Sequence, residues 1–374
     1  MSTNIRELLE EMGRLDASDL YITVDAPPMF RVEGVTSPWG ERRYTPEETE
    51  TMALSLMSPT QKLYFARRWE MNLAISFPDL GRFRVNIFRQ RGYYGLVFRH
   101  IKIEIRTIDD LGLPQVFKSI AMTKRGLVLV AGRTGSGKST TLAALVDYRN
   151  SNATGHIVTI EDPIEFVHQH KMSIVTQREI GIDTHGYGSA LKHTLRQAPD
   201  VILIGEVRDT ETMEAAIDYA ETGHLCLATI HANNANQAIE RVMNFFPPER
   251  HRQIYLQLSL NLRAIISQRL IPTVDGWRVV AVEILLDTPR VKDLIHKGQV
   301  DYLKEVMAQG NIEGMQTFDQ SIFDLYKRGL IDLDNALAYA DSANDLRLRI
   351  KTEEVGEKKD RMDIRFRIKP DYRT

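Results

Sequence analysis

The sequence predicts an α/β protein in two parts: a small α+β domain over residues 1–100 and, after a linker at residues 101–115, a larger α/β domain over residues 116–350. Two observations support this division. A chain of 374 residues is longer than one compact core usually holds. Near Val116 short apolar runs begin to alternate with helical stretches, a pattern typical of a parallel sheet covered by helices.

Capping sequences and short apolar runs predict the elements of the first domain. Helices are expected where a small polar residue precedes Glu or Gln by three positions, at Asn4–Glu7, Thr45–Glu48 and Ser58–Gln61. Strands are expected at Leu20–Val24, Met29–Val32, Leu73–Phe77, Arg82–Gln90 and Tyr94–His100. Apolar and polar residues alternate along residues 82–87, so this strand should have one apolar and one polar face.

Uninterrupted apolar runs predict the sheet of the second domain. Strands buried on both faces are expected at Leu127–Ala131, Ile157–Ile160, Val201–Ile204 and Leu225–Ile230. Beyond Ile265 the chain is predicted to form a helical appendage that includes Arg290–Lys297, Thr317–Arg328 and Leu333–Ser342. The last thirty residues hold ten Lys or Arg and seven Asp or Glu, so residues 351–374 are expected to be a solvated, partly disordered tail.

Composition narrows the class of protein. The formal net charge is −2, which gives no argument for nucleic acid or an anionic membrane as partner. The single cysteine, Cys226, excludes an internal disulfide and a cysteine metal cluster, and it favours a reducing compartment. No apolar run approaches the ~18 residues of a membrane span. We therefore expect a cytoplasmic protein that reaches a membrane only through a partner.

A phosphate-binding loop is the most specific motif. Residues 132–139 fit G-x-x-x-x-G-K-[S/T], between an apolar strand and a helical run. In such loops the glycines turn backbone N–H groups inward around phosphates, and the helix start adds a positive dipole end. Lys138 would reach the β- and γ-phosphates, and Ser139 would bind Mg²⁺. The expected nucleotide-binding residues are Gly132, Arg133, Thr134, Gly135, Ser136, Gly137, Lys138, Ser139 and Thr140.

Acidic residues follow the next two strands. Glu161 ends the second apolar run, and Glu206 follows the third. Ligands of open α/β sheets bind beyond the carboxyl ends of strands, so both carboxylates are candidates for holding Mg²⁺, directly or through water, and for positioning the attacking water. Either could take either role. The alternative is that each is a solvated carboxylate in a loop.

Two histidines flank the fourth predicted strand. His224 precedes it and His231 follows it. A histidine at a strand end is more often structural, but one beside a nucleotide site could sense the γ-phosphate. A metal site is not expected, because neither a thiol partner nor an H-E-x-x-H spacing is present.

Four ordered boxes carry a family resemblance. Residues 131–141, 160–168, 196–208 and 221–231 resemble the Walker A, Asp, Walker B and His boxes of secretion ATPases, and of the PilT/PilU family of type IV pilus retraction ATPases in particular. The resemblance extends to about Lys351. It implies a PAS-like first domain, a RecA-like second domain, and a ring hexamer that binds ATP between domains and subunits. It also implies that the ATPase lies peripherally at the inner membrane and acts there on a PilC-like platform protein. This action would drive pilus retraction and twitching motility.

Several segments resemble the PilU branch of this family more than the PilT branch: residues 196–199, 231–237, 315–320 and 341–349. PilU-like proteins are thought to act with a PilT-like partner, so we expect an accessory retraction ATPase in a homohexamer or a mixed ring. Two departures from the family pattern occur. Residues 289–296 replace a segment typical of PilT, and Arg133 replaces a common proline.

The resemblance also points to arginines of the first domain, Arg84 and Arg99. A motor that closes one domain over ATP needs cations on the γ-phosphate, as an arginine finger supplies. The alternative is a solvated strand face. Arg208, two residues after Glu206, is expected instead to hold the Walker B loop.

Other functions remain as alternatives. A self-sufficient PilT-like motor shares every motif. Pilus assembly and type II secretion ATPases usually carry extra N-terminal domains and a tetracysteine zinc module, neither of which is found here. A non-catalytic ring subunit is disfavoured by the intact boxes. A RecA-type nucleic-acid motor is disfavoured by the near-neutral charge and the lack of a basic–aromatic stripe in the sequence, so no nucleic-acid partner is expected.

Overall fold

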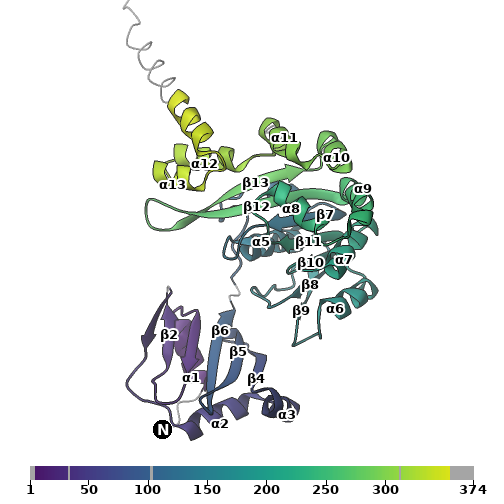
Figure 1. Ribbon diagram of the computed structural model, residues 1–374. Helices are drawn as coiled ribbons and strands as arrows, with labels where there is room; N and C mark the ends of the chain where they lie inside the picture. Colours follow the sequence, from purple (N-terminus) through teal and green to yellow (C-terminus); the bar gives the residue numbers. More distant parts are fainter. Residues whose placement is uncertain (1–4, 33, 102–103, 311–312, 354–374) are drawn as a thin grey trace, which may run out of the picture. The chain divides into compact units, whose positions relative to one another are not determined.

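The computed structural model describes residues 5–32, 34–101, 104–310 and 313–353 (Figure 1). The chain divides into two compact units, Met1–Arg106 with Arg149–Pro199, and Thr107–Tyr148 with Asp200–Thr374. The predicted tail lies almost wholly outside the described residues, as does Asn4 of the first capping sequence. No helix in the described part of the chain is both long enough and apolar enough to cross a membrane.

The N-terminal segment forms a six-stranded antiparallel sheet with one set of helices packed on it. The strand order is β3-β2-β1-β6-β5-β4. The strands are β1 (Asp19–Ile22), β2 (Met29–Val32), β3 (Val35–Pro38), β4 (Glu70–Phe77), β5 (Gly81–Gln90) and β6 (Tyr93–Ile101). The helices are α1 (Ile5–Arg14), α2 (Pro46–Leu56) and α3 (Pro59–Arg68), and their apolar residues share one core with the sheet.

Local sequence accounts for these elements. The capping boxes at Thr45 and Ser58 are both formed, and each is followed by a proline in the first turn, where no backbone N–H is needed. Along β5 the alternation is as predicted: Phe83, Val85 and Ile87 are buried, and the polar residues between them are half-buried. The small α+β domain predicted at the N-terminus is therefore confirmed, and its sheet is antiparallel.

A second sheet has seven strands in the order β13-β12-β7-β11-β10-β8-β9. The strands are β7 (Gly126–Ala131), β8 (Gly155–Glu161), β9 (Ser173–Glu179), β10 (Val201–Ile204), β11 (Leu225–Ile230), β12 (Leu262–Pro272) and β13 (Arg278–Leu286). All four predicted apolar runs are strands in it. The pairs β12–β7, β7–β11, β11–β10 and β8–β9 are parallel, and the pair β12–β13 is antiparallel. A mostly parallel sheet domain is thus confirmed.

Helices connect the strands of this sheet along the chain and follow the last strand (Figure 1). They are α4 (Val116–Ala121), α5 (Lys138–Asn152), α6 (Tyr187–Thr194), α7 (Thr210–Glu221), α8 (Ala235–Met243), α9 (His251–Asn261), α10 (Pro289–His296), α11 (Leu303–Gln309), α12 (Phe318–Lys327) and α13 (Leu333–Tyr339). The last four form the predicted C-terminal helical part. Short 3₁₀ turns lie at Leu195–Gln197, Pro248–Arg250 and Val300–Tyr302.

The prediction that the chain is helical from Ile265 onward is wrong for residues 265–286. These residues belong to the hairpin β12–β13, and helices resume only at Pro289. Polar residues in β12 obscured the strand, because Ser267 and Gln268 interrupt the apolar run although both are buried. The turn does contain Asp275–Gly276, a dipeptide typical of hairpins.

The free edge of β13 is partly covered by the chain that precedes α12. Ile284 donates its backbone N–H to the carbonyl of Gln316 at 2.8 Å and accepts the N–H of Gln316 at 3.2 Å. The Gln316 side chain also donates to the carbonyl of Val282 at 2.9 Å. The C-terminal part is thereby bonded to the sheet edge as well as packed on it.

Candidate nucleotide-binding site

The phosphate loop connects β7 to α5, and its geometry explains its glycines. A Cβ at Gly132 would lie 2.2 Å from Ser136 Oγ and 3.0 Å from the backbone oxygen of Gln268, so no larger residue fits there. Gly135 and Gly137 have φ of 77° and 92°, a region that L side chains rarely adopt. These three glycines therefore allow the loop to turn tightly between the end of β7 and the start of α5.

Polar groups of the loop are arranged for an anion. The ammonium group of Lys138 donates to the carbonyls of Gly132 at 2.8 Å and Arg133 at 3.0 Å, which holds it across the loop. The hydroxyl oxygen of Ser136 is buried and has no hydrogen-bond partner among the residues that the structure describes. Ser139 and Thr140 lie half-buried in the first turn of α5. A glycine cradle with an unpaired buried hydroxyl fits a phosphate group.

The start of α5 is anchored to the neighbouring strand. The side chain of Gln268 on β12 donates to Thr141 Oγ1 at 2.7 Å, and both residues are buried. The helix that presents Ser139 and Thr140 is therefore fixed to the sheet at its first turn.

Glu206 and His231 meet where β10 and β11 end. His231 Nε2 lies 2.7 Å from Glu206 Oε1, so an Nε2–H proton can be donated to this carboxylate. Arg208 donates to Glu206 Oε2 through Nε at 2.8 Å, with its Nη2 at 2.6 Å, in agreement with the predicted role of Arg208 at the Walker B loop. Both carboxylate oxygens are thus engaged, and the structure brings Glu206 and His231 together.

The two strand ends are also joined through the backbone. Val207 donates its N–H to the carbonyl of Thr229 at 2.9 Å, and Thr229 Oγ1 donates to the carbonyl of Gly205 at 2.6 Å. His224 lies just before β11 and bonds locally to Thr222, at the opposite end of the strand from His231. The geometry therefore places one of the two histidines with Glu206 and the other away from it.

Glu161 is the last residue of β8, in the other compact unit. Burial raises the pKa of its carboxyl group to about 7, although hydrogen bonds from Thr159 Oγ1 at 2.7 Å and from Gln177 Nε2 at 3.4 Å act in the opposite direction. A carboxyl group whose pKa lies near neutral pH can both accept and release a proton.

Arg84 and Arg99 face each other on neighbouring strands. They are directly opposite in the β5–β6 register. Arg99 donates to Asp19 Oδ1 at 2.8 Å, and this buried carboxylate gives Arg99 a structural partner within its own sheet. Arg84 is half-buried on the polar face of β5. Both arginines belong to the compact unit that does not contain the phosphate loop.

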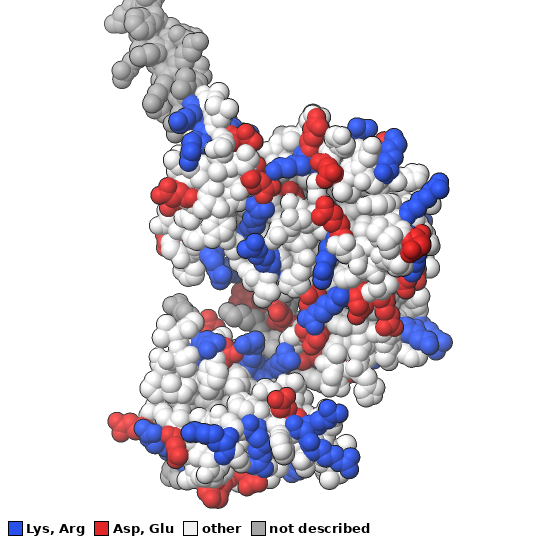
Figure 2. All heavy atoms as spheres, in the orientation of Figure 1, with Lys and Arg blue, Asp and Glu red and all other residues white. Residues whose placement is uncertain are grey.

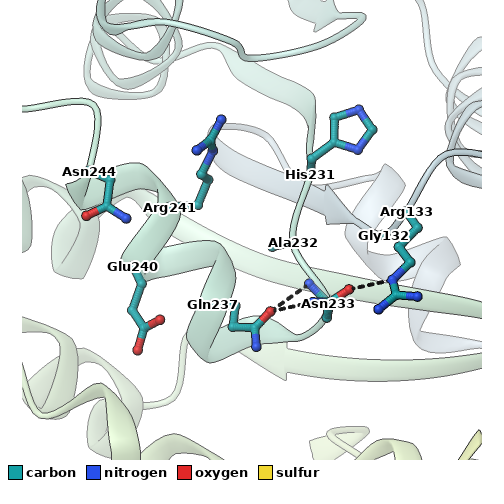
Figure 3. A pocket seen from close by; sticks show the side chains of 9 residues that line it. All are labelled: Gly132, Arg133, His231, Ala232, Asn233, Gln237, Glu240, Arg241 and Asn244. Atoms are coloured by element: carbon teal, nitrogen blue, oxygen red, sulfur yellow. Dashed lines mark hydrogen bonds between the residues drawn. The ribbon is translucent and has the colours of Figure 1, made fainter.

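A polar pocket of about 350 Å³ adjoins the phosphate loop (Figure 3). Its lining consists of Gly132, Arg133, His231, Ala232, Asn233, Gln237, Glu240, Arg241 and Asn244. Arg133 Nε donates to Asn233 Oδ1 at 3.0 Å, and Asn233 Nδ2 donates to Gln237 Oε1 at 2.8 Å. The loop that follows His231 is therefore held by Arg133, a residue that the sequence analysis expected only to contact the nucleotide.

Several residues of this site were not expected from sequence. Asn233, Gln237 and Arg241 line the pocket, and Arg269 on β12 donates to the Asn233 carbonyl at 3.4 Å and to the Tyr339 carbonyl at 2.8 Å. Asn233 and Gln237 lie in the segment 231–237 that resembles the PilU branch, but no binding role was expected for them, and Arg241 and Arg269 belong to no motif. The one available sequence signal was the polar run after His231, where Asn234 caps α8 by accepting from the Gln237 N–H.

Comparison with known proteins identifies the family. The type II/IV secretion system protein family matches residues 65–301. The chain is 54% identical over 346 residues to the type IV pilus ATPase PilU of Pseudomonas aeruginosa, covering 92% of this chain and 91% of that protein. The chain belongs to the PilT/PilU family. Identity to the type IV pilus retractation ATPase PilT of the same organism is 42% over 333 residues, covering 89% and 97%.

A solved structure supports the same family at the level of the fold. The crystal structure of the pilus retraction motor PilT with bound ADP superposes with a TM-score of 0.86 at 40% identity, and it covers 92% of this chain and 99% of that one. The chain is thus a PilU-like type IV pilus ATPase with the PilT-like fold, and a nucleotide-binding protein. This confirms the family and the fold class predicted from the sequence.

Proposed function

We propose that this protein is an ATP-hydrolysing motor subunit that supports pilus retraction and twitching motility as an accessory to a PilT-like retraction ATPase. The observation that carries the proposal is the junction of β7, β10 and β11. There the phosphate loop with Lys138, the Glu206–His231 pair and the pocket beside Arg133 lie in one compact unit. The greater identity to PilU than to PilT favours the accessory role.

Different residues of the site carry out the separate parts of ATP binding and hydrolysis. Backbone N–H groups of residues 132–140 and the Lys138 ammonium bind the phosphates of ATP. Mg²⁺, when bound, would neutralise charge on the β- and γ-phosphates, and Ser139 with Glu206 or Glu161 would hold it, directly or through water. The other carboxylate positions the attacking water. His231, bonded to Glu206, responds to the γ-phosphate, while Arg84 and Arg99 supply cations in the closed state.

The proposal also concerns how copies of the chain assemble. We infer a ring, either a homohexamer or a mixed ring with the PilT-like partner, that acts on a PilC-like platform protein from the cytoplasmic side of the inner membrane. The proposed domains are residues 1–100, the linker 101–115, the ATPase domain 116–350 and the charged tail. No nucleic-acid partner is proposed.

Retraction measured in cells tests the function. Deleting the chain should weaken retraction under load and leave pili able to assemble, and Lys138→Ala should fail to restore the lost force. Lys124→Ala, an exposed lysine outside the loop, is the matched control and should restore it. Full-force retraction in cells that contain this protein but no PilT-like ATPase would show a self-sufficient motor instead. Wild-type retraction by Lys138→Ala would refute the motor role altogether.

A further inference from the structure

One guanidinium group, that of Arg269, lies between the nucleotide site and the C-terminal helices. Arg269 is on β12, and its side chain is 22% exposed. On one side it donates to the carbonyl of Asn233, in the loop between His231 and α8, at 3.4 Å. On the other side it donates to the Tyr339 carbonyl at 2.8 Å and to Asp341 Oδ1 at 2.6 Å. All these residues belong to the same compact unit as the phosphate loop.

The C-terminal helices hold this guanidinium more firmly than the loop does. Its Cζ atom lies 3.8 Å from the centre of the ring of Phe318, the first residue of α12, in a cation–π contact. The bonds to Tyr339 and Asp341 are charge-assisted and shorter than the bond to Asn233. The position of the C-terminal helices therefore decides where Arg269 can meet the Asn233 carbonyl.

Asp341 is in turn fixed by α11 and α12. Lys304 on α11 donates to its second carboxylate oxygen, Oδ2, at 3.1 Å. Asp319 Oδ1 on α12 accepts the backbone N–H of Asp341 at 2.7 Å and that of Ser342 at 3.4 Å. The Asp341 side chain is 13% exposed, so its ion pair with Arg269 avoids much of the solvent screening that weakens surface pairs. Asp341 thus joins α11 and α12 to one arginine.

The charges of this network are balanced. Arg269 and Lys304 are cations, and they pair with the carboxylates of Asp341 and Asp319. Figure 2 shows basic and acidic side chains interspersed over the C-terminal helices as well. Because each charge of the network is paired within the chain, its role lies inside the protein rather than in binding an external anion.

The loop after His231 also touches the phosphate loop and the end of β10. Asn233 accepts a hydrogen bond from Arg133 of the phosphate loop, as Figure 3 shows, and His231 pairs with Glu206. A shift of this loop would therefore displace His231 from Glu206 and Asn233 from Arg133 together. A misplacement of about 1 Å in an active site can lower the rate on the order of a hundredfold.

Three segments that resemble the PilU branch converge on Arg269. Residues 231–237, 315–320 and 341–349 are far apart in the sequence. Each supplies one contact of the guanidinium group: a backbone carbonyl, an aromatic ring and a carboxylate. The residues of these segments that distinguish the chain from the PilT pattern therefore form part of one cluster in space.

We propose that Arg269 is a positioning residue for ATP hydrolysis and that it couples the loop after His231 to the C-terminal helices through Asp341. It acts on the nucleotide site through Asn233. A nucleotide that shifts the phosphate loop moves Asn233 through Arg133, and the shift reaches the C-terminal helices. Such coupling is reciprocal, so these helices also influence the site. The inference rests on the proposed function, because it concerns hydrolysis at that same site.

A second arginine on β12 is a matched control for a purely structural role. Arg263 is also 22% exposed, and it pairs with Asp287 Oδ2 at 2.7 Å. It donates to the carbonyls of Arg125 at 3.0 Å and Leu260 at 3.4 Å. Its bonds resemble those of Arg269 in kind and length. Arg263, however, lies beside the start of β7, at the opposite end of that strand from the phosphate loop.

ATPase kinetics of the full-length chain test the positioning role. Arg269→Gln and Asp341→Asn should each lower kcat about tenfold and leave the KM for ATP within about twofold, because the phosphate loop itself is unchanged. The double variant should lose no more than either single variant, since the two residues act as one unit. Arg263→Gln should lower the free energy of unfolding as much as Arg269→Gln does, yet keep the kcat of wild type.

Hydrogen exchange measures the coupling without turnover. In wild type, ADP should slow exchange at residues 131–141 and also, by about twofold or more, at residues 339–346. In Arg269→Gln, ADP should slow exchange only at the first segment, whereas Arg263→Gln should behave like wild type.

Each opposite result has a distinct meaning. Wild-type kcat in Arg269→Gln, or an equal loss of kcat in Arg263→Gln, overturns the positioning role. A wild-type protein in which ADP protects residues 131–141 but leaves residues 339–346 unchanged overturns the coupling. Both results leave the ATPase function standing. A wild-type protein that neither hydrolyses ATP nor binds ADP refutes the proposed function itself, and the inference with it.

Discussion

The buried carboxyl group of Glu283 should make the stability of the protein depend on pH. Glu283 lies on β13, is 1% exposed, and accepts hydrogen bonds from the N–H of Ala235 at 2.7 Å and from Ser267 Oγ at 3.1 Å. Ala235 is the first residue of α8, directly after the loop that carries His231. Burial raises the pKa of this carboxyl group from 4.5 to about 7, and the charge of Asp341 adds to the effect.

The direction in which stability changes with pH follows from proton binding. Between pH 4.5 and 7 the folded protein keeps a proton that the unfolded chain has released, so stability falls as the pH rises through this window. Glu283→Gln removes the titration but keeps an acceptor oxygen. A shift from 4.5 to about 7 corresponds to about 3 kcal/mol at pH 8 and about 1 kcal/mol at pH 5, so the variant should gain about 2 kcal/mol relative to wild type between these two pH values.

Urea unfolding followed by circular dichroism at both pH values measures this difference. Any cost of the new amide N–H₂ group is the same at both, so it cancels. Glu305→Gln is the control, because that side chain is exposed. A Glu283→Gln variant whose stability relative to wild type is equal at the two pH values would show that the carboxyl group is not desolvated as described.

Three further predictions concern the site and the surface. Gly132→Ala should weaken ATP binding at least tenfold in calorimetry, because its Cβ meets the Gln268 backbone oxygen at 3.0 Å. Glu161→Gln and Glu206→Gln should each bind ATP yet lose about a hundredfold or more in turnover, and unchanged turnover per bound ATP would remove either from catalysis. Trp69→Gly should leave the unfolding free energy unchanged or raise it by up to about 1 kcal/mol, since it relieves the left-handed φ of 61° at this exposed residue; a clear loss would make Trp69 structural.

Local signals made much of the fold predictable. The capping boxes at Thr45 and Ser58 and the four apolar strands need only neighbours in sequence, and the phosphate loop is a contiguous motif. The hairpin β12–β13 was not predicted, because the environment of its polar residues depends on partners that are distant in the sequence. The side-chain N–H₂ group of Gln268 is buried with a hydrogen-bond partner, Thr141, that lies far away in the chain.

The sequence motifs of the candidate site were predictable, but the contacts between their residues were not. The order of strands in a parallel sheet decides which strand ends are neighbours, and this order is not written in any one segment. Glu206 and His231 could each be named from sequence, yet their 2.7 Å contact depends on β10 pairing with β11. Likewise, the bond between Arg133 and Asn233 joins residues 100 positions apart.

The bonding of Gln316 to the edge of β13 has a consequence for solubility. An unpaired strand edge is a template on which another chain can add a strand, and native proteins avoid this by covering such edges. In this protein the two backbone bonds between Ile284 and Gln316, with the side-chain bond to Val282, cover the second half of the outer strand β13. A chain shortened to end before Gln316 would uncover these groups, so it should aggregate even where its phosphate loop is intact.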